Sequence, residues 1–199
     1  PPGLRSDSGV RAGDVISPHY DPMIAKLIVH GATREIALRR LARGLEETQV
    51  AGTVTNLAFL GALARHDGFA AGEVDTGLIA RDLDALTEVP ELPPRAVAQA
   101  ALVAAGLVGE AGAQTGFALW APLSRTLLLT EGDDIHSVVL RADGPDRATL
   151  VVAGTEVAAE RIDGAWRFDG HPAVPMVQQG REITLFGRVG RSFRVTDPL

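Results

Sequence analysis

The stretch MIAKLIV, residues 23–29, is a short apolar run between Pro22 and Gly31. Its length and its aliphatic side chains predict a β-strand. Because the run is hydrophobic without a polar alternation, we expect the strand to be buried on both faces.

Helices are predicted on the C-terminal side of the strand. Thr33 is suited to cap the first of them, because a hydroxyl can accept a backbone N–H of the first turn. Apolar residues then recur at helical spacing at Ile36, Leu38, Leu41, Ala42 and Leu45. The same spacing predicts a second helix over residues 56–66 and a shorter third helix over residues 76–86. We assign residues 1–86 to one domain of strands and helices.

A proline-rich segment, TEVPELPP at residues 87–94, follows this domain. Its three prolines cannot continue a helix and favour extended backbone, so the segment is interpreted as a linker. Residues 95–108 consist mainly of Ala, Val and Leu, which predicts a helix that is buried on all sides.

Short alternating runs of apolar and polar residues, starting near Phe117, fill the remainder. Turn sequences such as Asp163-Gly164 and Asp169-Gly170 separate them. Seven or eight short strands at this spacing predict an antiparallel β-barrel or sandwich. One buried helix followed by a run of strands predicts a sheet wrapped around a central α-helix over residues 95–199. The fold class expected for the whole chain is therefore α+β.

Composition excludes several classes of partner. The 199 residues carry 19 Lys and Arg against 25 Asp and Glu, for a net charge of −6, so neither nucleic acid nor a membrane surface is expected as a partner. No Cys is present, which excludes disulfides and thiolate chemistry. The opening PPGLRSDSG has no Met and leads at once into a strand, so we expect a fragment of a longer protein.

Candidate catalytic side chains are few. His19 and Asp21 would share a face of an extended segment and could bind a metal or act as an acid–base pair, but no third ligand has matching spacing. A loop pair that bonds turn amides is the alternative. Lys26 is the one Lys of the chain, either a base in the buried strand or an ammonium paired with a carboxylate such as Asp21. Surface positions are expected for the remaining histidines, His30, His66, His136 and His171. No metal site and no catalytic residue is predicted in this chain.

A longer motif surrounds the strand. Residues 15–27 read VISPHYDPMIAKL, with Asp7-Ser8 and Gly13-Asp14 upstream and, downstream, the segments 52–56 (GTVTN), 69–76 (FAAGEVDT) and 78–79 (LI). These segments occur in this order over residues 4–84. Together they resemble the C-terminal part of the biotin carboxylase component of biotin-dependent acyl-CoA carboxylases. The resemblance implies that residues 1–86 are the C-terminal part of the C-domain of an ATP-grasp enzyme. It also implies that residues 95–199 are the helix-in-barrel domain that mediates alpha–beta subunit contact.

The resemblance further implies an ATP-dependent ligase that carboxylates biotin with bicarbonate. ATP, Mg and biotin are expected in the full-length enzyme, and none of them is expected to be bound completely by this fragment. The implied partners are the carboxyltransferase beta subunit and the biotin carrier domain of the same chain. The residues HYDPMIAKL are most similar to members that act on methylcrotonoyl-CoA, and members acting on propionyl-CoA or geranyl-CoA are the alternatives. A cytoplasmic location is expected if the protein is bacterial, and a mitochondrial one for eukaryotic relatives. A non-catalytic protein-binding adaptor is the alternative from another class.

Three sets of site residues are expected. Thr76 and Gly77 match a stretch that approaches the adenine edge of ATP in the family, with a helix N-cap as the alternative role for Thr76. Arg5 and Asp21 match positions at the biotin carboxylase dimer interface. Trp166 and Phe168, in a hairpin, are expected to be exposed and to contact the beta subunit, because aromatic side chains are common anchors of protein interfaces.

Overall fold

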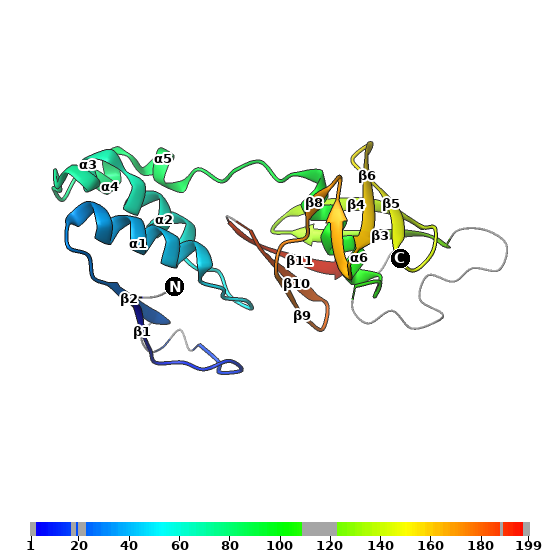
Figure 1. Cartoon of the computed structure of the whole chain (residues 1–199), viewed down its shortest axis with the longest axis horizontal. Coiled ribbons are helices and arrows are strands. Elements are labelled where there is room, and N and C mark those ends of the chain that lie inside the picture. Colours follow the sequence, from blue (N-terminus) through cyan, green and yellow to red (C-terminus); the bar gives the residue numbers. More distant parts are fainter. Residues whose placement is uncertain (1–2, 17–18, 20–22, 109–122, 188, 197–199) are drawn as a thin grey trace. The chain divides into compact units, whose positions relative to one another are not determined.

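The computed structural model describes residues 3–16, 19, 23–108, 123–187 and 189–196. The chain divides into two compact units, residues 1–50 with 54–89, and residues 51–53 with 90–199 (Figure 1). None of the described helices is both long enough and apolar enough to cross a membrane. The strand expected near Phe117 lies outside the described residues.

In the first unit, β1 (Leu4–Ser8) and β2 (Ala25–Val29) form an antiparallel two-stranded sheet. The strand prediction for MIAKLIV is confirmed, but its expected burial on both faces is wrong. Lys26 is exposed and Ile28 is 39% exposed, whereas Leu27 is half-buried and packs on the helical core. The physical reason is that helix α1 packs on one face of this sheet, the face that carries Leu27.

Five helices follow in the first unit: α1 (Arg34–Glu47), α2 (Leu57–Arg65), α3 (Asp67–Ala71), α4 (Leu78–Arg81) and α5 (Leu83–Thr87). The predicted cap of α1 is confirmed, because the Thr33 hydroxyl accepts the Ile36 N–H at 3.3 Å. Ala42, Leu45 and Ala64 form a small core between α1 and α2. The helix expected over residues 76–86 is instead two short helices, which are separated at Asp82.

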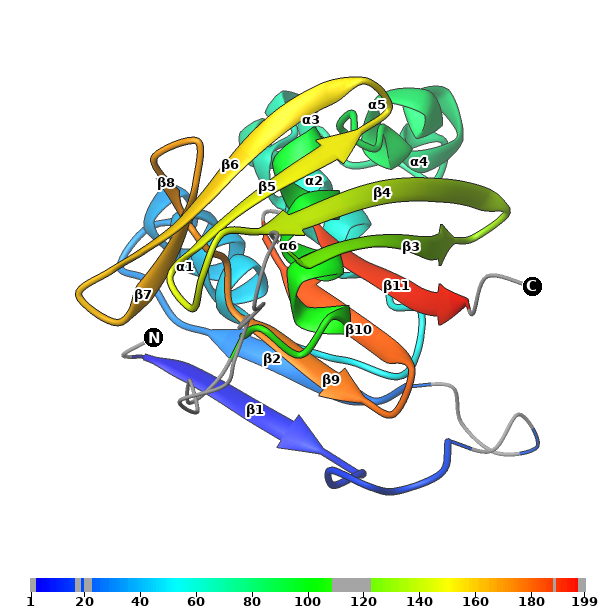
Figure 2. The same ribbon diagram turned by 90° about the vertical axis from the view of Figure 1, so that its right-hand side faces the viewer.

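The second unit begins with α6 (Pro94–Ala104) and continues as a nine-stranded antiparallel sheet. The strands in chain order are β3 (Leu123–Glu131), β4 (Asp134–Ala142), β5 (Arg147–Val152), β6 (Thr155–Ile162), β7 (Ala165–Phe168), β8 (His171–Pro172), β9 (Met176–Gln179), β10 (Glu182–Phe186) and β11 (Gly190–Thr196). Their order across the sheet is β8-β7-β6-β5-β4-β3-β11-β10-β9. The sheet is strongly curled (Figure 2). Since β8 and β9 do not pair with each other, the described strands form an open half-barrel, so the antiparallel barrel expected from the sequence is confirmed only as a curled antiparallel sheet.

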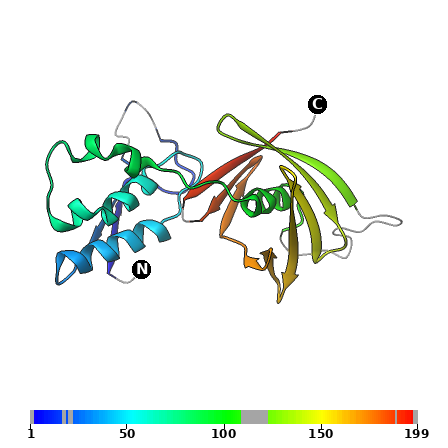
Figure 3. The same ribbon diagram turned by 90° about the horizontal axis from the view of Figure 1, so that it is seen from above.

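Helix α6 lies inside the curl of this sheet (Figure 3) and packs against β3, β4, β5, β6, β7 and β10. Seven of its consecutive residues, from Val97 to Val103, are buried. The helix ends at Ala104 and not at Val108, because Gly106 takes a left-handed φ of 72°. Gly106 N–H then donates to Val103 O and Leu107 N–H donates to Leu102 O, which is the Schellman pattern of a helix C-terminus.

Tight turns connect the strands at the positions that the sequence predicts. At Asp163-Gly164 and Asp169-Gly170 both residues have positive φ, as a two-residue hairpin requires. The turn at Ala153-Gly154 has the same conformation, with Ala153 at φ 47°. Sequence reasoning missed this turn, since alanine does not favour the left-handed region.

Candidate functional site

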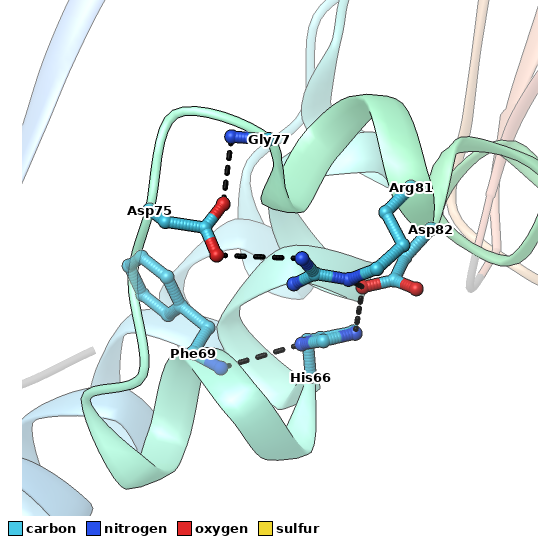
Figure 4. A network of polar contacts seen from close by, with 6 residues as sticks. All are labelled: His66, Phe69, Asp75, Gly77, Arg81 and Asp82. Carbon is cyan, nitrogen blue, oxygen red and sulfur yellow. Dashed lines mark hydrogen bonds and ion pairs between the residues drawn. The ribbon is translucent and has the colours of Figure 1, made fainter.

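A polar network joins the short helices of the first unit and borders the expected site residues Thr76 and Gly77 (Figure 4). We call it the α3–α5 network. It consists of the side chains of His66, Asp75, Arg81 and Asp82 and of two backbone N–H groups, those of Phe69 and Gly77.

His66 lies at the N-cap of α3, and both of its ring nitrogens are engaged. Nδ1 accepts the backbone N–H of Phe69 at 3.3 Å, and Nε2 lies 3.2 Å from Oδ2 of Asp82. The side chains of His66 and Asp82 are 23% and 28% exposed, so His66 is half-buried and less exposed than the surface position expected for it. Because neither nitrogen is available to a substrate, the imidazole is not arranged as a general base.

Asp75 and Arg81 continue the network from Asp82. Arg81 Nε lies 3.4 Å from Asp82 Oδ2, and Arg81 Nη1 lies 3.3 Å from Asp75 Oδ2. The other oxygen of Asp75 accepts the Gly77 N–H at 2.7 Å. The Gly77 hydrogen bond, and then Arg81, hold the pKa of the Asp75 carboxyl below its ordinary value. Asp75, and next Asp82, raise the pKa of Arg81, so the charges of the network support one another.

Arg34 on α1 fixes the other side of α3. Its guanidinium donates to the carbonyl of Phe69 at 2.5 Å and to that of Ala70 at 3.2 Å. Its Cζ atom lies 5.0 Å from the centre of the Phe69 ring, within range of a cation–π contact. Helix α3 is thus held by a histidine at its N-terminus and by an arginine at its C-terminus.

The network borders a loop, and its four charged or titratable side chains contact one another. Residues 72–77, between α3 and α4, are all exposed, while Leu78 directly after them is 2% exposed and buried. No group of three or more His, Asp or Glu side chains in the described part of the chain could hold a metal ion. These contacts are suited to holding the loop in one conformation.

Thr76 and Gly77 lie on this loop, and both are exposed. The alternative role of Thr76 as N-cap of a helix is wrong. Gly77 occupies the N-cap position of α4, and the carboxylate of Asp75 accepts its N–H instead. Sequence reasoning missed His66, Asp75, Arg81 and Asp82. An Asp two residues before a glycine was the available signal, since Asp side chains commonly bond the N–H two residues on.

Arg5 lies on β1 and pairs with Asp7 of the same strand, with Nε 2.7 Å from Oδ1. Its side chain is 74% exposed, so it can be reached by another molecule. Asp21 lies outside the described residues, so its suggested pairings with His19 and Lys26 do too. Lys26 lies opposite Asp7 in the register of β1 and β2.

Trp166 and Phe168 on β7 are buried, at 7% and 2% exposure. The expectation that these rings are exposed is wrong, because they occupy the concave side of the half-barrel and belong to its core. The exposed residues of β7 are Ala165 and Arg167. Phe168 also lines a pocket of about 350 Å³ beside Gln99 and Val174.

A family model matches most of the first unit. Residues 1–81 match the model of the biotin carboxylase C-terminal domain. These residues are therefore similar to a biotin carboxylase C-terminal domain. The α3–α5 network lies around the last residues of the match.

Relatives with curated names agree with this assignment. The chain is 53% identical over 76 residues to the mitochondrial methylcrotonoyl-CoA carboxylase subunit alpha of Dictyostelium discoideum, a match that covers 38% of this chain and 11% of the relative. It is 44% identical over 112 residues to the subunit of the same name from Glycine max, covering 53% of this chain and 15% of the relative. The chain therefore spans a small share of the length of these relatives.

Among solved structures, the chain is similar to part of a single-chain, multi-domain long-chain acyl-CoA carboxylase. The sequence identity is 24% and the TM-score is 0.42, with all of this chain and 17% of that chain covered.

Proposed function

We propose that this chain is part of the alpha subunit of an ATP- and biotin-dependent acyl-CoA carboxylase of the methylcrotonoyl-CoA type. The observation that carries the proposal is the 53% identity over 76 residues with a methylcrotonoyl-CoA carboxylase alpha subunit. Propionyl-CoA and geranyl-CoA carboxylases remain the alternatives within this class.

The second unit supports the same proposal. The match to the Glycine max subunit covers 53% of the chain. The residues before Pro90 are less than 53% of the chain, so the match extends into the second unit. A half-barrel curled over α6 agrees with a helix-in-barrel domain that mediates contact with a carboxyltransferase beta subunit. We assign this role to residues 95–199, after the C-terminal part of the ATP-grasp C-domain. Of the linker expected at residues 87–94, the structure leaves residues 88–93 outside helices, because Thr87 ends α5 and Pro94 begins α6.

In such an enzyme, ATP with Mg²⁺ activates bicarbonate, and biotin carries the carboxyl group to the acyl-CoA. Among the described residues, no group of three or more His, Asp or Glu side chains could hold a metal ion, and the sequence has no Gly-x-x-x-x-Gly-Lys phosphate-binding loop. We propose that the sites for the ATP phosphates, Mg²⁺ and biotin lie in other parts of the enzyme.

The contribution of this chain to nucleotide binding is proposed to be the loop with Thr76 and Gly77, at the adenine edge. Its support is geometric, because both residues are exposed and the Asp75 carboxylate fixes the backbone of Gly77. Arg5 and Asp21 are proposed to lie at the biotin carboxylase dimer interface. The Arg5 side chain is 74% exposed, so a second subunit can contact it.

Two measurements test this function. Calorimetric titration of the 199-residue chain with Mg-ATP should show no measurable binding. A micromolar affinity would contradict the proposal that the ATP phosphate and Mg²⁺ sites lie in other parts of the enzyme. The full-length alpha subunit should catalyse biotin-dependent, bicarbonate-dependent ATP hydrolysis and should co-purify with its carboxyltransferase beta subunit. A full-length protein that binds a partner without this hydrolysis would support the adaptor alternative.

A further inference from the structure

We infer that His66 is a positioning residue: as a neutral imidazole with its hydrogen on Nε2, it caps α3 and, through Asp82 and Arg81, fixes the loop that carries Thr76 and Gly77. The role of the loop in nucleotide binding rests on the proposed function, whereas the positioning itself rests on the contacts within the first unit.

The hydrogen-bond pattern assigns the tautomer. A backbone N–H is always a donor, so Nδ1 of His66 must accept from Phe69 and carries no hydrogen. Nε2 therefore carries the hydrogen and donates to the Asp82 carboxylate, 3.2 Å away. A doubly protonated ring would bring a second donor against the Phe69 N–H, so the cap requires the neutral form.

The contacts continue without a break from His66 to the loop. Asp82 Oδ2 faces both His66 and Arg81, so one carboxylate oxygen joins the cap of α3 to the arginine. Arg81 in turn faces Asp75, whose second oxygen holds the Gly77 N–H (Figure 4). Close packing supports this path: a Cβ added at Gly68 would lie 3.3 Å from His66 Cε1, so the ring fits closely over the first turn of α3.

Two substitutions separate the two tasks of His66. In His66→Asn the amide oxygen replaces Nδ1 and can still cap α3, but the side chain is too short to reach Asp82. In His66→Gln the amide replaces Nε2 and can reach Asp82, but it does not cap α3. Asp82→Ala breaks the same connection from the other end. Arg39→Gln, which breaks an exposed ion pair with Glu35 on α1, is the matched control.

The experiment is nuclear magnetic resonance on the 199-residue chain, with ¹⁵N shifts of the imidazole and hydrogen exchange of backbone amides. We expect the His66 ring to show a bare Nδ1 and a protonated Nε2. We expect His66→Asn and Asp82→Ala to lose the protection of the Gly77 amide and to keep that of Phe69. His66→Gln should show the reverse, and Arg39→Gln should change neither.

A hydrogen on Nδ1 in the parent chain, or full Gly77 protection in His66→Asn and Asp82→Ala, would overturn the inference. The same variants of the full-length alpha subunit test the link to nucleotide binding, where the KM for ATP should rise severalfold with kcat unchanged. Lost Gly77 protection with an unchanged KM would leave the positioning role established and would refute the adenine-edge assignment of Thr76 and Gly77.

Discussion

Gln99 of α6 and Val174, between β8 and β9, are joined by two hydrogen bonds. The Gln99 amide donates from Nε2 to the Val174 carbonyl at 2.7 Å, and its Oε1 accepts the Val174 N–H at 3.0 Å. Gln99 is only 5% exposed, and it is a polar residue in a helix whose other buried members are apolar. The helix therefore holds the backbone of one specific segment of the half-barrel.

That segment connects the two ends of the sheet. Ala173 N–H donates to the Trp166 carbonyl on β7 at 2.9 Å, and Phe186 N–H on β10 donates to the Pro175 carbonyl at 2.7 Å. Residues 173–175 thus bond to both ends of the curl, while Gln99 of α6 bonds to their middle residue.

Replacement of Gln99 by Leu should destabilise the second unit by about 2–4 kcal/mol. The two backbone groups of Val174 would lose their partners, and each buried polar group left unpaired costs ~1–3 kcal/mol. Urea denaturation followed by tryptophan fluorescence measures the change. Gln178→Leu on β9, an exposed position, is the control and should cost less than ~0.5 kcal/mol. Equal losses in the two variants would show that the Gln99 bonds are dispensable.

Leu102 tests the burial of α6. It is 0% exposed in the main core, so Leu102→Ala should cost ~2–5 kcal/mol and Leu102→Asp should prevent folding of the second unit. Ile135→Asp places the same charge at a residue that is 70% exposed and should leave the unit folded. Thermal denaturation with near-UV circular dichroism compares them. A normal melt for Leu102→Asp would mean that the helix is not enclosed by the sheet.

Ala153→Gly should stabilise the second unit by roughly 0.5–1 kcal/mol. Ala153 has a φ of 47°, a conformation that costs a residue with a Cβ ~1–2 kcal/mol and that glycine adopts freely. Ala158→Gly on β6, an exposed strand position, should instead destabilise by ~0.5–1 kcal/mol. The two midpoints in urea should move in opposite directions. A lower midpoint for Ala153→Gly would contradict the strain at this turn.

Acid should release the loop at Asp75. Because its folded-state pKa lies below the ordinary Asp value of ~3.9, the ionised carboxylate stabilises the loop above that value. This contribution is lost as the pH falls through the lowered pKa. The Gly77 amide shift should therefore show a step below pH ~3.9. Asp75→Asn keeps an acceptor but does not titrate, so its Gly77 shift should lack the step. A step in both proteins would assign the transition to another group.

Local sequence rules were sufficient for several elements. Thr33 caps α1 as predicted, because an N-cap bond involves only neighbouring residues of the chain. Asp163-Gly164 and Asp169-Gly170 form the expected turns for the same reason. The composition of residues 95–108 predicted a buried helix, and motifs along residues 4–84 indicated the family of the first unit.

Longer-range features required the tertiary structure. The His66–Asp82 contact links residues 16 positions apart, and the Gln99–Val174 pair links residues 75 positions apart, so no local pattern contained either one. Trp166 and Phe168 looked like exposed anchors, but the curl of the sheet turns their side of β7 inward. Sequence periodicity determines which residues share a face of a strand, whereas the curvature of the whole sheet decides which face is buried.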